Sequence, residues 1–340
     1  MKKAVLGQFY TKKDYWLKKH IQEFIASCKC KIAYDPFVGN GDLLKVACDL
    51  GFKKTKGLDI EPLPEYEKND SLVSIPKVEN AIIITNPPYL TNYSAKRKGV
   101  YDKVSKYFDD TKYEDIYMIA LDKMLNAQDY VVAIIPETFI NSSFKNKFKL
   151  HSITILEENC FNDTETPVCV ACFDGKVKSF DKIKAYKNEK YLNTLGHFEN
   201  LRLKPNKNVK IEFNNIKGNL ALRAVDTTNP SKTIRFMKKD ELDYDLKGIK
   251  ESSRLITIIK TPIDNNSIFN DFISESNSIL ENFRSTTNDV LLSPFKGNMK
   301  DGRRRRRLDY ETARAIIEQA YLKIWGGDDL WTTSNYLNTL

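Results

Sequence analysis

The chain has 340 residues, of which 41% are hydrophobic and 29% charged, and its formal net charge at pH 7 is +9. This length allows two domains, and the composition is that of a globular protein rather than a disordered or fibrous one. No stretch approaches the ~18 consecutive apolar residues of a membrane span, and the N-terminus lacks the apolar core of a secretory signal. We therefore expect a cytoplasmic protein that does not bind membranes.

Strand and helix signals alternate through the first half of the chain. Short apolar, β-branched runs predict strands at 32–34, 55–60, 81–85, 130–135, 152–156 and 168–173. Helical patterns lie at 12–27, 42–50, 113–127 and 141–149. Thr11 is the expected N-cap of the first helix. This alternation predicts a mostly parallel sheet covered on both faces, with the last two strands as an antiparallel pair at one edge. The polar segment 91–112 is expected to be a loop beside the active site.

The pattern changes after about residue 176. Segments rich in Lys, Asn and Asp then alternate with short strand-like pieces at 209–213 and 255–259, and a last helix is expected at 310–325. We therefore expect two domains, a catalytic one at 1–176 and an α+β one at 177–340.

Positive charge is concentrated in the second half of the chain. Residues 1–180 hold 26 Lys and Arg against 24 Asp and Glu, whereas residues 181–340 hold 28 against 21. Lys296 and Lys300 precede a run of five arginines, Arg303, Arg304, Arg305, Arg306 and Arg307. Such a run can neutralise several DNA phosphates, and one or two of its members could reach guanine edges in the major groove. A solvated loop is the alternative.

The motif Asn86-Pro87-Pro88-Tyr89 is the most informative one in the chain. It directly follows the expected strand 81–85, so it predicts a rigid elbow at the carboxyl edge of the sheet, where open α/β folds bind their ligands. The backbone carbonyls of this elbow can accept bonds from a ligand, Asn86 adds a side-chain carbonyl, and Tyr89 adds a flat aromatic face. These groups can hold a planar molecule that carries an exocyclic amine.

Three carboxylates precede the elbow. The first opens the loop from Asp35 through Pro36 to Gly39 and Gly41, in which the two glycines let the backbone approach a ligand. An acid at the head of this loop would repel a pyrophosphate, so the pattern favours a ligand with a cationic centre and no phosphates. Asp59 ends the next strand, where doubly wound folds hold a ribose, and Asp70 could accept a bond from an adenine amine.

In this order, the motifs resemble the γ-class of S-adenosylmethionine-dependent DNA adenine-N6 methyltransferases from bacterial restriction-modification systems. The resemblance covers roughly residues 7–175 and rests on 7–11, 35–41, 59, 70, 86–89, 115–117, 134–139 and 158–161. It implies a Rossmann-like, mostly parallel sheet of the class I methyltransferase type with a C-terminal target-recognition domain. The implied partners are double-stranded DNA and a cognate restriction endonuclease.

The resemblance also implies roles for individual residues. Those around the cofactor S-adenosylmethionine would be Tyr10, Thr11, Asp35, Pro36, Gly39, Gly41, Asp59, Ile60 and Asp70. Those at the reacting centre would be Asn86, Pro87, Pro88, Tyr89 and Phe161. Asn86 Oδ1 and the Pro87 carbonyl would accept the two N–H bonds of the target amine, and the rings of Tyr89 and Phe161 would sandwich a base flipped out of the duplex. Orientation and electrostatic stabilisation would then suffice, without a metal.

Several alternatives stay open. The same elbow motif serves enzymes that methylate guanine N2 of ribosomal RNA or a glutamine of release factors. Enzymes that methylate cytosine N4 more often have Ser in place of Asn86, so adenine is preferred and cytosine stays open. A catalytically silent nucleic-acid-binding protein could also keep the fold. A zinc site at Cys28, Cys30, Cys169 and Cys172 is disfavoured, because the first pair is spaced too closely and the second lies in a strand-like run. We expect reduced core thiols and no metal.

Overall fold

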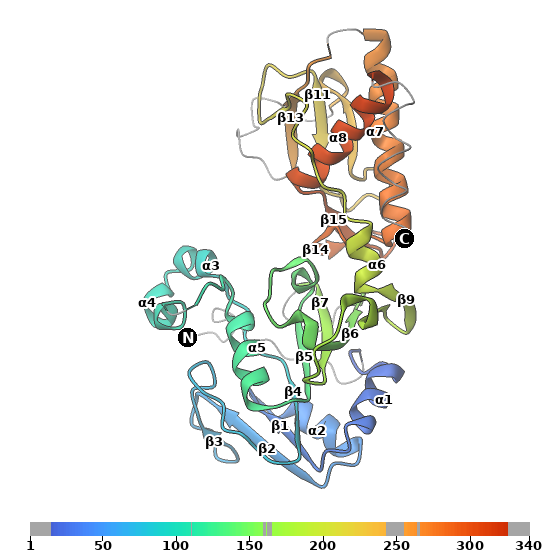
Figure 1. Ribbon diagram of the computed structural model, residues 1–340. Helices are drawn as coiled ribbons and strands as arrows, with labels where there is room; N and C mark the ends of the chain where they lie inside the picture. The colour runs from blue at the N-terminus through green and yellow to red at the C-terminus, as the bar shows by residue number, and fades with distance from the viewer. Residues whose placement is uncertain are drawn as a thin grey trace. The chain divides into compact units, whose positions relative to one another are not determined.

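The computed structural model describes residues 15–109, 111–158, 161, 165–242, 255–263 and 266–325. The chain divides into two compact units, Met1–His197 and Phe198–Leu340 (Figure 1). This division lies later than the expected one at 176/177. The reason is that two further strands, β8 (Lys184–Lys187) and β9 (Lys190–Thr194), extend the sheet of the first unit.

Among the described residues, the first unit is built on a nine-stranded sheet in the order β3-β2-β1-β4-β5-β7-β6-β8-β9. Besides β8 and β9, its strands are β1 (Ile32–Asp35), β2 (Lys54–Asp59), β3 (Glu67–Lys68), β4 (Ala81–Thr85), β5 (Val131–Pro136), β6 (Leu150–Ile155) and β7 (Val168–Phe173). β1 to β5 run parallel, and β7 enters antiparallel between β5 and β6. The Rossmann-like, mostly parallel sheet of the class I methyltransferase type is therefore confirmed.

The central strands are apolar along their whole length because the sheet is covered on both faces. Every residue of β4 and of β5 is buried, as expected for strands inside a parallel sheet. β6 and β7 are antiparallel as predicted, but they do not form the edge of the sheet, since β8 pairs parallel with the outer side of β6.

Three helices of the first unit match the predicted ones. They are α1 (Lys19–Ser27), α2 (Asp42–Asp49) and α5 (Ile116–Ala127). α1 begins later than expected, and Thr11 lies outside the described residues. Asp115 caps α5, because its carboxylate accepts the backbone N–H of Tyr117 (3.4 Å). The predicted helix at 141–149 is wrong: short 3₁₀ turns, η3 (Glu137–Asn141) and η4 (Lys147–Lys149), take its place. Ser142 donates to the Phe139 carbonyl (2.8 Å), one of the local side-chain bonds that compete with a helix.

The segment 91–112 is not the expected loop. It contains α3 (Asn92–Arg97), α4 (Tyr101–Val104) and the 3₁₀ turn η2 (Ser105–Tyr107). Thr91 caps α3 by accepting the backbone N–H of Ser94 (3.0 Å). The apolar side chains Ala95, Val100, Val104 and Phe108 form a small core with Leu90, Ile116 and Ile119. This buried apolar surface keeps the segment folded.

The second unit has the expected α+β arrangement. Its antiparallel sheet, in the order β10-β13-β11-β12, consists of β10 (Glu212–Phe213), β11 (Leu220–Arg223), β12 (Arg235–Lys238) and β13 (Ile256–Lys260). The hairpin β14 (Ser293–Asn298) and β15 (Arg304–Arg307) forms a separate pair. The helices of the second unit are α7 (Asn266–Thr287) and α8 (Tyr310–Trp325), and η6 (Lys239–Glu241) is a 3₁₀ turn. The helix α6 (Leu195–Asn200) spans the division between the units, and the 3₁₀ turn η5 (Phe180–Lys182) belongs to the first unit.

α7 packs against α8 and β12 (Figure 1). α8 has the predicted bounds, whereas the long helix α7 is not among the predicted helices. Its buried residues include Phe269, Phe272, Leu280 and Phe283, whose spacing places them on one helical face. Within the part of the chain that the structure describes, no helix is both long and apolar enough to cross a membrane.

Candidate functional site

A cavity of about 300 Å³ lies where β1, β2 and β4 end. The expected site residues that line it are Asp35, Pro36, Gly39, Asp59, Ile60, Asp70, Asn86 and Pro88. The carboxyl ends of parallel strands meet at one edge of a sheet, so residues far apart in the sequence arrive at the same place. The volume is at the lower end of the range of small-molecule sites, about 300–1,000 Å³.

Asp35, at the end of β1, is 1% exposed. Its Oδ1 accepts the Thr85 hydroxyl (2.5 Å) and the Phe37 backbone N–H (3.0 Å). Burial raises the pKa of Asp35 to about 7, and the nearby charge of Asp59 adds to the rise. A ligand that brought a positive centre to this carboxyl would favour its ionised form and lower the pKa again. The residues therefore fit a ligand with a cationic centre.

Asp59, at the end of β2, holds the loop that follows β1. Its Oδ2 accepts the backbone N–H of Gly39 (2.9 Å), and its Oδ1 accepts the backbone N–H of Glu61 (2.9 Å). Gly39 has a φ of +52°, which favours glycine, and a Cβ there would meet no atom within 4 Å. Glycine is thus required for the backbone conformation, and the loop is fixed to β2 by a buried carboxylate.

Gly41 has a different neighbour from the one expected. It is the N-cap of α2 with a φ of +77°. A Cβ on Gly41 would collide with the Tyr66 hydroxyl, and one on Gly57 would collide with the same ring. The space beside Gly41 that is expected to hold a ligand is occupied by Tyr66, and Gly41 is not among the residues that line the cavity.

Asp70 lies beside Asp59, because the backbone N–H of Asn69 donates to the Asp59 carbonyl (2.8 Å). Its Oδ2 accepts bonds from Lys106 Nζ (2.9 Å) and the Tyr107 hydroxyl (2.8 Å). Its Oδ1 is buried and receives no hydrogen bond from the described residues. An unsatisfied buried acceptor costs about 1–3 kcal/mol, so this oxygen suits a ligand that donates an N–H or O–H.

Lys106 and Tyr107 are functional candidates outside the predicted site, because 91–112 is expected to be a loop. The sequence does carry a signal for them. Val100, Val104 and Phe108 recur every four residues, a spacing that predicts a helical face. Lys106 would then point away from that core, whereas Tyr107 packs against its edge.

The elbow after β4 places Asn86 and Pro88 at the cavity, while Pro87 and Tyr89 are buried. The Tyr89 hydroxyl donates to the Ile134 carbonyl (2.7 Å) and also contacts Asn86 Oδ1. The Tyr89 and Phe161 rings lie edge to face, with centroids 6.2 Å apart and an interplanar angle of 68°. The two rings therefore do not form a parallel sandwich in this structure. Tyr10 and Thr11 lie outside the described residues.

Four of the five arginines, Arg304–Arg307, form the strand β15 rather than a solvated loop, and Arg303 directly precedes it. Arg304 and Arg306 are 7% and 1% exposed, whereas Arg303, Arg305 and Arg307 are more accessible. Side chains alternate between the two faces of a strand, so the run divides into an inward and an outward set. The Arg305 guanidinium lies 4.8 Å from the centre of the Phe295 ring, and Arg303 is paired with Asp301 (2.8 Å).

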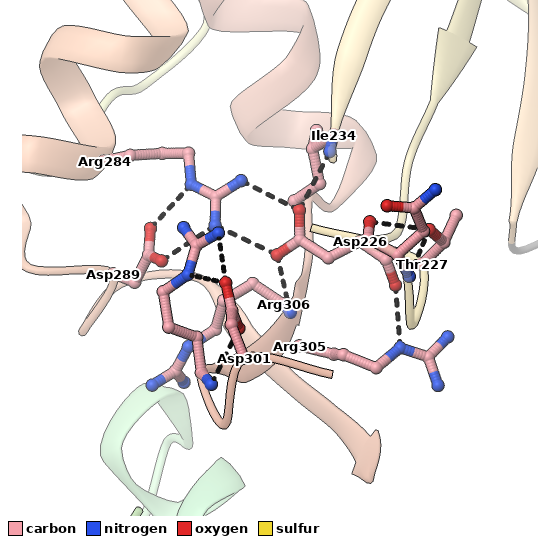
Figure 2. A network of polar contacts seen from close by, with 10 residues as sticks. Asp226, Thr227, Ile234, Arg284, Asp289, Asp301, Arg305 and Arg306 are labelled. Carbon is pink, nitrogen blue, oxygen red and sulfur yellow. Dashed lines mark hydrogen bonds and ion pairs between the residues drawn. The ribbon is translucent and has the colours of Figure 1, made fainter. Parts of the chain in front are cut away.

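A buried ionic network holds this strand (Figure 2). The Asp226 carboxylate, 0% exposed, accepts two bonds from Arg284 (both 2.9 Å). It also accepts the backbone N–H groups of Ile234 (2.9 Å) and Arg306 (3.0 Å). Arg284 in turn pairs with Asp289 (2.8 Å), and Arg305 Nε donates to the Asp226 carbonyl (2.8 Å). Asp226 therefore connects α7, the chain after β11 and the hairpin.

Five of the six cysteines lie in the described part of the chain. In the described ranges, no group of three or more His, Cys, Asp and Glu side chains could hold a metal ion. Cys28, Cys30, Cys48, Cys169 and Cys172 are free thiols. Burial raises the pKa of Cys28 and of Cys172 to about 12.

Residues 54–164 match the family model described as Eco57I restriction-modification methylase. The matched stretch is less than half of the chain, and it contains Asp59, Asp70, Asn86 and Phe161. The match supports a restriction-modification methylase in this part of the chain. A search of curated proteins gives no match.

Parts of the chain are similar to solved structures. A protein from Listeria monocytogenes, described as a class I S-adenosylmethionine-dependent methyltransferase, is 14% identical with a TM-score of 0.36, over 50% of this chain and 64% of its own. The methyltransferase subunit of a type I restriction-modification system from Streptococcus thermophilus is 14% identical with a TM-score of 0.35, over 57% and 52%. A protein from Pyrococcus horikoshii described as an RNA methyltransferase is 17% identical with a TM-score of 0.33, over 52% and 92%. The chain spans less than two thirds of the first two proteins, and at these TM-scores the likenesses carry no argument about function.

Proposed function

We propose that this protein is a DNA methyltransferase of the restriction-modification type, which transfers a methyl group from S-adenosylmethionine to adenine N6. The observation that carries the proposal is the cavity at which the carboxylates of Asp35, Asp59 and Asp70 meet Asn86. The match of residues 54–164 to a restriction-modification methylase model supports it. A cognate endonuclease would act on the same site in unmethylated DNA.

The cofactor would lie along the three carboxylates. Asp35 would face its positive centre, the Asp59-bound loop would surround its ribose, and Asp70 Oδ1 would accept the amine of its adenine. Each placement uses the chemistry of one residue. Asp35 is a buried acid with a raised pKa, Asp59 holds an ordered loop at a strand end, and Asp70 has a carboxylate oxygen without a donor from the described residues. When bound, S-adenosylmethionine supplies an electrophilic methyl group.

Asn86 would orient the target. The amine of adenine is a poor nucleophile, because its lone pair is delocalised into the ring. If Asn86 Oδ1 and the Pro87 carbonyl accept its two N–H bonds, the nitrogen can pyramidalise and direct its lone pair at the methyl group. The target amine would take over the acceptor that the Tyr89 hydroxyl now contacts. A base that reaches this elbow must first leave the duplex, and the rings of Tyr89 and Phe161 would have to rearrange to stack on it.

One labelling experiment tests the proposal. The protein is incubated with methyl-labelled S-adenosylmethionine and with DNA, RNA or protein, and the labelled product is digested to identify the modified group. N6-methyladenine in DNA is expected. N4-methylcytosine, labelled RNA or labelled protein glutamine would each identify one of the alternative substrates, and no label in any acceptor would favour a silent nucleic-acid-binding protein.

Asp59→Ala should weaken the affinity for S-adenosylmethionine by about 1.5–3 kcal/mol, the range for hydrogen bonds to a charged group. The variant loses the acceptor that holds the Gly39 N–H and the expected acceptor of the ribose hydroxyls. Calorimetry with S-adenosylhomocysteine measures the loss. A parallel titration with adenosine and 2′,3′-dideoxyadenosine separates a lost ribose contact from a loosened loop. If Asp59 binds the ribose hydroxyls directly, the variant loses the preference for adenosine. If Asp59 only holds the loop, the variant keeps that preference. Unchanged affinity in the folded variant would move the cofactor elsewhere.

We further propose that the second unit chooses the DNA sequence and that the outward set of the arginine run contacts the duplex. Replacing Arg303, Arg305 and Arg307 together by alanine should flatten the salt dependence of DNA binding by about one log–log unit for each phosphate that the variant no longer neutralises. Arg306→Ala should instead destabilise the second unit, because this side chain is 1% exposed. Binding isotherms across a salt series and denaturant unfolding distinguish the two effects. If the triple variant keeps the wild-type slope, the DNA surface must be sought among the lysines of 182–250.

A further inference from the structure

The segment 91–108 touches both functional parts of the proposed site. Its small apolar core includes Leu90, the residue directly after the elbow, and Ile116 at the start of α5. Lys103, Val104 and Tyr107 from the same segment line the cavity. The segment is thus built onto the elbow and also forms a wall of the cavity next to Asp70.

The two donors that reach Asp70 bind the same oxygen. Lys106 Nζ and the Tyr107 hydroxyl both donate to Oδ2, at 2.9 and 2.8 Å. Lys106 Nζ also lies 4.7 Å from the centre of the Tyr107 ring, so the lysine and the tyrosine support each other. Two bonds to one oxygen fix the rotation of a carboxylate. Oδ1, buried and without a bond from the described residues, is the oxygen left for a ligand at the cavity that Asp70 lines.

A carboxylate oxygen only accepts hydrogen bonds, so the group it selects must be a donor. The exocyclic amine of adenine is such a donor. Hypoxanthine, its closest analogue, carries a carbonyl oxygen at that position, whose lone pairs would face the negative oxygen. A site built around a polar group strongly rejects an analogue that leaves this group unpaired. An apolar pocket discriminates much less between such analogues.

We propose that Lys106 and Tyr107 are positioning residues that orient Asp70 so that its Oδ1 reads the exocyclic amine of the cofactor's base, which makes the site select adenine over hypoxanthine. The inference rests on the proposed cofactor. It goes beyond the contact of Asp70 itself, because it assigns the selectivity to two residues of the segment that follows the elbow. Lys106 and Tyr107 act through Asp70 and need not touch the cofactor.

The test compares the affinities for S-adenosylhomocysteine and S-inosylhomocysteine, measured by calorimetry on the full chain. Wild-type protein should prefer the adenine compound by about 100-fold or more. Tyr107→Phe and Lys106→Met should each reduce this ratio by about 10-fold, mainly by lowering the affinity for S-adenosylhomocysteine. Each variant removes one donor from Oδ2, so the carboxylate of Asp70 can rotate. Asp70→Asn should shift the preference toward the inosine compound, because the amide can donate to the carbonyl of hypoxanthine.

The segment offers matched controls. Lys96 Nζ lies 4.8 Å from the centre of the Tyr101 ring, which repeats the geometry of Lys106 and Tyr107, yet neither Lys96 nor Tyr101 lines the cavity. Lys96→Met and Tyr101→Phe should keep the wild-type ratio. For each variant, the midpoint of denaturant unfolding is first compared with that of the wild-type protein.

Three results would overturn the inference. If Tyr107→Phe and Lys106→Met keep the wild-type ratio, whether or not both affinities fall, the pair has only a structural role. The proposed methyltransferase function then still stands. If wild-type protein binds both compounds with equal affinity, Asp70 does not read the base. Failure of wild-type protein to bind either compound would overturn the inference and the proposed cofactor together, and the labelling experiment would then give no product.

Discussion

Replacing Asn86 with alanine should lower the rate of methyl transfer by about 100-fold or more while leaving cofactor binding nearly intact. Asn86 lines the cavity at the end of β4, and in the proposed mechanism its Oδ1 contacts the target amine rather than the cofactor. An acceptor whose bond strengthens as positive charge develops on the amine acts mainly in the transition state. Loss of one such group typically costs 10²–10³ in turnover.

Single-turnover assays with DNA and calorimetry with S-adenosylhomocysteine measure the two quantities separately. Asn69→Ala is a useful comparison, because Asn69 also lines the cavity but its side-chain amide donates to Ser71 and to the Ser74 carbonyl (both 2.9 Å). That variant should change turnover far less than Asn86→Ala does. Near-normal turnover in Asn86→Ala would remove Asn86 from the reacting centre, even if the protein proves to be a methyltransferase.

Much of the first unit could be predicted from the sequence because its signals are local. The buried strands are continuous apolar runs, such as Ala81–Thr85, and β1 and β2 end at the acids Asp35 and Asp59. Once the strands are known to be parallel, the meeting of Asp35, Asp59 and Asn86 follows, since the two acids end their strands and Asn86 directly follows one. The sequence thus contains enough information to bring these three residues to one edge of the sheet before any coordinates are known.

The missed features depend on contacts between distant residues. β8 and β9 are polar and half exposed, so they lack the apolar signal of an internal strand and are recognised only through their pairing with β6. Lys106 and Tyr107 have no motif of their own, and their relevance appears only when the fold brings them to Asp70.

The arginine run illustrates the same limit. Five identical residues give no sequence signal that separates inward from outward positions. The division follows from the pairing of β15 with β14 and from one buried carboxylate, Asp226, far away in the sequence. A basic run in a sequence can therefore be partly structural, and its net charge overestimates the number of side chains that can reach a phosphate.

Asp226→Ala should destabilise the second unit by about 3–5 kcal/mol, the usual cost of removing one partner from a buried ion pair. The carboxylate is 0% exposed and accepts two bonds from Arg284 together with the backbone N–H groups of Ile234 and Arg306. Its loss leaves the Arg284 guanidinium with Asp289 as its remaining carboxylate partner in the network and leaves two buried N–H groups without their acceptor (Figure 2). Denaturant unfolding, followed by a probe in each unit, measures the loss.

Asp301→Ala provides the matched control. Asp301 also pairs with an arginine of the hairpin, Arg303, but the pair is at the surface, where solvent screens it and its contribution to stability is small. We expect the unfolding midpoint of this variant to stay close to that of the wild type. Asp226→Ala should in addition weaken DNA binding, because β15 loses its anchor, while the first unit still binds S-adenosylhomocysteine. Equal stability of the Asp226 and Asp301 variants would show that the buried network does not hold the hairpin, and the inward arginines would then need another explanation for their burial.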